Sequence, residues 1–224
     1  MNRPTCRTTI VLDRLCKQES LECLTAYNNE TSFTSNNSHA LYAYEIACQF
    51  GRLDLVYWLI NNSDKDNRYF NFEGWIHFGL DTASKHKQPK VFRYLLSVCP
   101  QINHVNLHTL FQWSCRDGSK ECAEILLDMY PDIDITYNSH VVFRKSCKHL
   151  DVALWLQSLK PWLYKVSVKN GKVVDLHVNT PQEQAFYYKK YPLWLMSPNS
   201  PNKKSIFYRL PEEISKMIIH EWLL

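Results

Sequence analysis

A phrase of thirteen residues recurs four times in this chain of 224 residues, at steps of 36, 31 and 32 residues. The first copy runs from Ala47 to Leu59, and the fourth copy lacks two residues. Self-similarity at a nearly fixed spacing means that one supersecondary unit is stacked on copies of itself. The copies begin at Ala47, Ala83, Ser114 and Ser146. The sequence therefore predicts a solenoid.

Each copy holds two apolar stretches separated by a polar break, such as residues 49–51 in the first copy. The second stretch has a period near 3.6, which is typical of a helix with one buried face. Glycine at the break can end a helix, and a proline after the second stretch starts an extended loop. The unit is therefore predicted to be two short antiparallel helices joined by a tight turn. The prolines that follow the last three copies are Pro100, Pro131 and Pro161.

The four copies resemble ankyrin repeats over about residues 40–163. The first copy matches the family's core best, through Ala47-Cys48, Gly51, Leu53–Val56 and Leu59. The threonine-proline-leucine-histidine opening of that family is absent, and Tyr42–Glu45 stands in its place in the first copy. This departure places the hydrogen bonds between neighbouring turns in question. The resemblance implies a protein–protein interaction scaffold.

The predicted fold is mainly α, an ankyrin-like solenoid of helical hairpins with a C-terminal capping subdomain made of a β-hairpin and helices. Residues 1–38 are interpreted as an N-terminal cap and degenerate repeat, because a weaker copy surrounds Leu15-Cys16 and Ser20–Leu24. Residues 39–163 hold about four repeats. Residues 164–224 form the hairpin and helical cap.

Residues 164–178 alternate around Asn170-Gly171, a strong hairpin signal. A two-residue turn would place Val166 opposite Asp175 and split the apolar face. A three-residue loop, 169–171, is favoured because it pairs Val166 with Val174. Its apolar face would contain Tyr164, Val166, Val168, Val174, Leu176 and Val178.

A helix from Gln182 to about Leu195 is predicted after the hairpin. Thr180 stands at its N-cap position and Pro181 in its first turn.

Half of the eight cysteines fall at the same phase of the repeat. A residue that recurs in phase packs into the same position each time, where cysteine behaves as a small hydrophobe. These four are predicted to be reduced and buried, as expected in a reducing compartment. Trp58 and Trp155 are likewise predicted to be core residues. The four cysteines are Cys16, Cys48, Cys115 and Cys147.

The sequence holds no pattern typical of a catalytic or metal site. His104 and His108 are four residues apart, but no paired Cys-x-x-Cys sets accompany them. Only five glycines occur, and none forms a phosphate-binding loop or a nucleophile elbow. The net charge is +4 and its lysines and arginines are scattered, which argues against nucleic-acid binding. We therefore expect no enzyme activity, no cofactor and no metal.

The start of the chain lacks an apolar core segment, and no run of 18 apolar residues occurs. We therefore expect neither a signal peptide nor a membrane span.

The final segment, Leu210-Pro211-Glu212-Glu213-Ile214 followed by Met217 and Ile218, looks like the beginning of an F-box. In that family a leucine-proline pair starts a helix that docks on the Skp adaptor of a cullin-type ubiquitin ligase. The resemblance covers about fifteen residues, fewer than a full F-box has. The other interpretation, which we favour, is a terminal cap for the hairpin subdomain, because amphipathic helices are more often core than recruitment motifs.

The whole layout is most similar to the ankyrin-repeat proteins of mimivirus-like giant viruses. This similarity implies a location in the host cytoplasm, with the virion or the viral factory as further locations. The expected function is a scaffold that binds a host or viral protein. A substrate adaptor for a ubiquitin ligase is the alternative, and a structural virion component is a weaker third hypothesis. The adaptor hypothesis assigns partner binding to Leu210, Pro211, Ile214 and Ile218.

Overall fold

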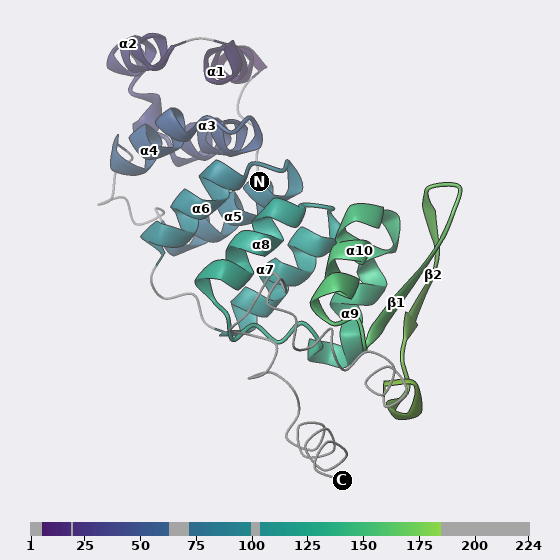
Figure 1. Ribbon diagram of the computed structural model, residues 1–224. Coiled ribbons are helices and arrows are strands. Elements are labelled where there is room, and N and C mark those ends of the chain that lie inside the picture. The colour runs from purple at the N-terminus through teal and green to yellow at the C-terminus, as the bar shows by residue number, and fades with distance from the viewer. Residues whose placement is uncertain (1–5, 19, 63–71, 100–103, 185–224) are drawn as a thin grey trace.

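The computed structural model describes residues 6–18, 20–62, 72–99 and 104–184. These residues form a stack of helical hairpins followed by a two-stranded sheet (Figure 1). The first helices of the hairpins are α1 (Cys6–Gln18), α3 (Asn37–Gln49), α5 (Phe72–Lys85), α7 (His104–Arg116) and α9 (Tyr137–Lys145). The second helices are α2 (Leu21–Thr31), α4 (Leu53–Asn62), α6 (Pro89–Val98), α8 (Lys120–Met129) and α10 (Leu150–Leu159). Two 3₁₀ turns, η1 (Phe33–Ser35) and η2 (Ser146–Lys148), and the strands β1 (Tyr164–Lys169) and β2 (Lys172–Val178) complete the described elements.

In the stack of hairpins, first helices pack on first helices and second helices pack on second helices. Each first helix packs against the next first helix, from α1 through α3, α5 and α7 to α9, and α4, α6 and α8 pack in the same way. The leucine that closes each phrase is fully buried in all four copies, so the apolar phase of the sequence is the phase of the core. The prediction of a mainly helical solenoid of hairpins is confirmed. The four closing residues are Leu59, Leu95, Leu126 and Leu156.

The turn inside each of the second, third and fourth hairpins requires a left-handed residue. Gly51 and Gly118 adopt φ of 72° and 74° there, and Lys87 adopts φ of 57° at the same position of the second copy. The next residue then donates its backbone N–H across the turn, as from Arg52 to the Ala47 carbonyl at 2.9 Å. Glycine takes this conformation without the strain that a Cβ brings. The predicted glycine helix stops are therefore confirmed.

The residue that follows each turn also bonds to the preceding hairpin. Arg52 Nη1 donates to the Cys16 carbonyl at 3.3 Å, and Gln88 Nε2 donates to the Gln49 carbonyl at 3.1 Å. The Ser119 hydroxyl donates to a carbonyl of the second copy in the same way. These hydrogen bonds join neighbouring repeats at equivalent positions, although the sequence opening that usually does so is absent.

Side-chain size at the turns is matched between neighbours. A Cβ on Gly51 would lie 2.2 Å from Gln88 Oε1, and a Cβ on Gly118 would lie 2.4 Å from His149 Nδ1. Where the turn residue is Lys87 instead, the next copy supplies the small Ser119. Each glycine therefore makes room for a large side chain of the following repeat.

The hairpin prediction was wrong in its loop. Asn170 and Gly171 form a two-residue turn with φ of 52° and 70°, and Lys169 pairs with Lys172 across it. A register shift between Ser167 and Val168 then brings Val166 opposite Leu176. The bulge, an extra residue in one strand, keeps Val166 on the same face as Leu176, which the three-residue loop was expected to do.

The bulge also limits the apolar face of the hairpin. Tyr164 is buried, and Val166, Leu176 and Val178 pack against the core. Val168 and Val174 lie beyond the register shift and are 46% and 59% exposed.

Cys147 does not follow the phase of the other three cysteines. Cys16, Cys48 and Cys115 are buried free thiols, whereas Cys147 is exposed. In the fourth copy, which lacks two residues of the phrase, the first helix is followed by the 3₁₀ turn η2. Within this turn Ser146 is buried and Cys147 is exposed.

The two predicted core tryptophans lie at the edge of the core. Trp58 and Trp155 are only partly buried, with ring centroids 6.3 Å from those of Phe33 and Phe111 respectively. The largest fully buried side chains are instead Tyr44, Tyr164, Phe92, Phe111 and Phe143.

After the hairpin, Thr180 caps a helical segment at residues 181–184. Its hydroxyl accepts from Glu183 N at 3.4 Å, and its own N–H donates to Glu183 Oε2 at 2.7 Å. This reciprocal pair is a capping box, so the predicted N-cap is confirmed. The expected continuation to Leu195 lies outside the described residues, and the division into three domains stays a prediction.

Candidate partner-binding surface

One side of each first helix is turned away from the stack at the same position of every repeat. Tyr44, Leu80, Phe111 and Phe143 occupy one core position, and each is at most 1% exposed. The next residue along each helix is rotated by about 100°; it is partly exposed in the first three copies and exposed in the fourth. We call this set the face row; its members are Glu45, Asp81, Gln112 and Arg144.

A second set lies four residues further on, at the C-terminal ends of α3, α5, α7 and the 3₁₀ turn η2. We call it the turn row. It begins with the half-buried Gln49 and continues with three exposed cations. Arg144 and Lys145, in the last turn of α9, lie beside its fourth member. The turn row consists of Gln49, Lys85, Arg116 and Lys148.

Charge therefore changes along the stack. The face row runs from glutamate and aspartate in the first two copies to arginine in the fourth. Burial raises the pKa of Asp81 above its usual value, and Asp117 raises it further, while Arg116 and Lys85 lower it. Arg116 Nε also donates to Asp117 Oδ1 at 2.7 Å, which fixes the guanidinium group. Carboxylates and cations of the two rows thus lie close enough to influence one another.

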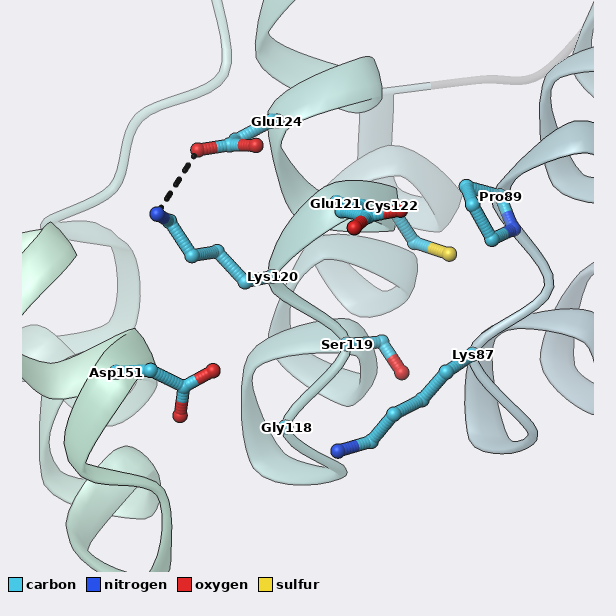
Figure 2. Close-up of a pocket in the computed structure, with 9 residues that line it drawn as sticks. All are labelled: Lys87, Pro89, Gly118, Ser119, Lys120, Glu121, Cys122, Glu124 and Asp151. Atoms are coloured by element: carbon cyan, nitrogen blue, oxygen red, sulfur yellow. Dashed lines mark ion pairs between the residues drawn. The ribbon is translucent and has the colours of Figure 1, made fainter.

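A hollow of about 330 Å³ opens beside the turns of the second, third and fourth copies. Figure 2 shows Lys120 directed toward Glu124, and their Nζ and Oε1 atoms are 3.5 Å apart. Burial raises the pKa of the Cys122 thiol to about 12, so this thiol stays protonated at neutral pH. The lining residues are Lys87, Pro89, Gly118, Ser119, Lys120, Glu121, Cys122, Glu124 and Asp151. This combination offers charged contacts rather than an activated nucleophile.

Within the described ranges, no group of three or more His, Cys, Asp or Glu side chains could hold a metal ion. His108, one of the two histidines considered as metal ligands, instead accepts a hydrogen bond through Nε2 from Asp134 N at 3.2 Å. Among the same residues, no helix is both long and apolar enough to cross a membrane.

The binding residues assigned from the F-box-like segment, Leu210, Pro211, Ile214 and Ile218, lie outside the described residues. The face row and the turn row were not identified from the sequence. They could have been found by aligning the four copies and asking which positions change in chemical type while their neighbours stay apolar.

Residues 44–139 match the family model described as ankyrin repeats (3 copies). The match lies inside the stretch of about 40–163 that resembled this family by sequence. The comparison with curated proteins and the comparison with solved structures gave no match. Residues 44–139 thus form ankyrin repeats, and such repeats indicate a protein–protein interaction scaffold.

Proposed function

We propose that this protein is a non-enzymatic scaffold that binds another protein along its face row. The observation that carries the proposal is a contrast between adjacent positions. The core position of the first helices is a large apolar residue in all four copies, whereas the next position is Glu45, Asp81, Gln112 and Arg144 in turn. Stacking alone needs the first pattern and places no demand on the second. A surface whose chemistry differs from repeat to repeat suits recognition of one particular partner.

The test replaces Glu45, Asp81 and Arg144 together by alanine. Wild type and variant are used as baits in a pull-down from host cell extract, and each protein recovered is then measured with purified components by calorimetry. We expect a partner that binds wild type and binds the variant at least about tenfold more weakly, as loss of several contacts at one interface requires.

The matched control changes the second helices, which form the other exposed layer. Tyr57 and Glu124 are exposed at one equivalent position of α4 and α8. Their replacement by alanine should leave binding unchanged. Equal loss in both variants would contradict use of the face row, and reproducible turnover of a substrate would contradict the scaffold proposal.

We further propose that the partner is a host or viral protein and that the encounter takes place in the host cytoplasm. The support is the similarity of the layout to ankyrin-repeat proteins of giant viruses. Localising the tagged protein in infected cells tests this, and a location outside the cell would contradict it.

A second candidate is a substrate adaptor, favoured by the Leu210-Pro211 sequence that resembles an F-box start. Deleting residues 206–224 separates it from a capping role. Loss of a co-purified Skp adaptor at an unchanged melting temperature would support the adaptor. Aggregation or earlier melting would support the cap, because terminal repeats need a polar cover to stay soluble.

A further inference from the structure

The turn row and the residues beside it carry a net positive charge. Lys85, Arg116 and Lys148 occupy the same position of the repeated phrase in three consecutive copies, at the ends of α5, α7 and the 3₁₀ turn η2, and Arg144 and Lys145 precede Lys148 in the fourth copy. Asp81 and Asp117 are the carboxylates among them, which leaves a net charge of +3 for this set. The chain as a whole has a net charge of +4.

Several of these cations are not neutralised by partners of their own. Lys85, Arg144, Lys145 and Lys148 make no ion pair with any residue that the structure describes. Arg116 does pair with Asp117, and this contact aims its guanidinium group rather than hiding it, since the Arg116 side chain remains 44% exposed.

The partial negative charge at the C-terminal ends of the helices reduces the positive potential of the turn row without cancelling it. A helix C-terminus carries about half a negative charge, so a single cation there leaves roughly half a positive charge. The fourth copy adds Arg144 and Lys145 to Lys148, and the backbone of its first helix departs from helical geometry at residues 138–140, where φ is positive. The positive potential is therefore strongest at the end of the row that adjoins the β-hairpin.

The spacing of the row fits an extended chain. Packed helices lie about 8 to 10 Å apart. An extended peptide in the polyproline II conformation advances about 3.1 Å per residue with three residues per turn, so every third side chain lies on the same side. Neighbouring row cations would therefore meet every third residue of a peptide that runs along the stack.

We propose that the turn row binds an extended acidic protein segment with carboxylates at every third position, which lie against Lys85, Arg116 and Lys148. This inference rests on the proposed scaffold function and names the chemistry of its partner. A protein segment fits better than a nucleic acid, because Asp81 and Asp117 interrupt the row and repel a uniformly charged phosphate backbone. Carboxylates held at fixed intervals avoid those two side chains.

The test measures fluorescence polarisation of a short labelled peptide with glutamate at every third position among serine and glycine. The measurement is made at about 0.1 M salt, where the Debye length is about 10 Å and distant charges are screened. Lys85→Glu with Lys148→Glu should weaken binding by about tenfold or more. Arg7→Glu with Lys90→Glu is the matched control, because it reverses two exposed cations that lie outside the row. The control should change binding by less than about twofold.

Four results would overturn the inference: no saturable binding to wild type, equal loss in the control variant, equal binding of a peptide with its glutamates grouped together, or tighter row-dependent binding of a thymidine oligonucleotide. The last result would assign the row to nucleic acid. The face-row variant of the scaffold test alters Asp81 and Arg144 but leaves Lys85, Arg116 and Lys148 unchanged, so the two proposals can fail separately.

Discussion

Replacing Tyr44 by phenylalanine tests how tightly the first two of the four repeats are packed. The Tyr44 ring is fully buried between α3 and α5, at 5.2 Å from the ring centroid of Trp75. Its hydroxyl faces Gly79 so closely that a Cβ there would lie 2.1 Å from the oxygen. Within the described part of the chain this hydroxyl makes no hydrogen bond of normal geometry, and the Cys48 thiol beside it is only a weak partner. Burial raises its pKa well above the usual value, and the nearby Cys48 thiol raises it further, so it stays protonated.

The expected change in the free energy of unfolding follows from the missing hydrogen bond of the Tyr44 hydroxyl. A buried hydroxyl without a partner costs about 1 to 3 kcal/mol relative to the unfolded chain, where water satisfies it. Removing the oxygen leaves only a small gap against Gly79. We therefore expect Tyr44→Phe to stabilise the fold by about 1 to 2 kcal/mol. For a chain of this size that corresponds to a rise in Tm of about 2 to 8 °C.

Tyr164→Phe is the matched control, because it removes the same atom from another fully buried ring. The Tyr164 hydroxyl donates to the Ile135 carbonyl at 3.3 Å and lies 3.2 Å from His140 Nδ1. Its loss should destabilise the fold by about 1 kcal/mol or more. Urea unfolding followed by circular dichroism measures both variants. If Tyr44→Phe is destabilising to the same extent as Tyr164→Phe, the reasoning is refuted and the Tyr44 hydroxyl must have a partner, with the Cys48 thiol as the nearest candidate.

Two further results are expected from single positions. Gly118→Ala should destabilise the fold by about 2 to 3 kcal/mol in the same urea assay, because φ is +74° and the new Cβ would meet the His149 ring; a change below about 0.5 kcal/mol would show that the turn relaxes freely. In thiol labelling of the native protein, Cys23 and Cys147 should react quickly while Cys115 stays protected, since burial raises its pKa and excludes the reagent. Equal labelling rates would show that the stack opens readily.

The identity of the repeat could be predicted because its signal is redundant. Four copies of one phrase, with leucines at Leu59, Leu95, Leu126 and Leu156 and glycines at two turns, depend on local preference and on period. Each copy gives the same information, so an error in one is corrected by the others. Helical hairpins, their stacking order and the burial of three in-phase cysteines follow from this, as does the Thr180 cap, which depends on residues adjacent in sequence.

The hairpin register could not be predicted, because two loops gave competing alignments and the bulge at Ser167/Val168 is a third solution. A bulge is selected by what the strand packs against. Here β1 lies on α10, and Gln157 of that helix accepts a hydrogen bond from Val166 N at 2.7 Å. The exposure of Cys147 also depends on how the first helix of the shortened fourth copy ends. The position of Cys147 in the repeated phrase does not give that information.

The sequence by itself determined that the chain forms stacked helical hairpins, because the apolar period and the turn residues are local properties that recur in each repeat. The tertiary structure alone decided which polar side chains share a surface. Glu45, Asp81 and Arg144 are far apart in sequence and lie in one row only because α3, α5, α7 and α9 stack side by side. The same stacking gathers scattered lysines and arginines into the turn row. Charge can be counted along a chain, but its effect depends on distance in space.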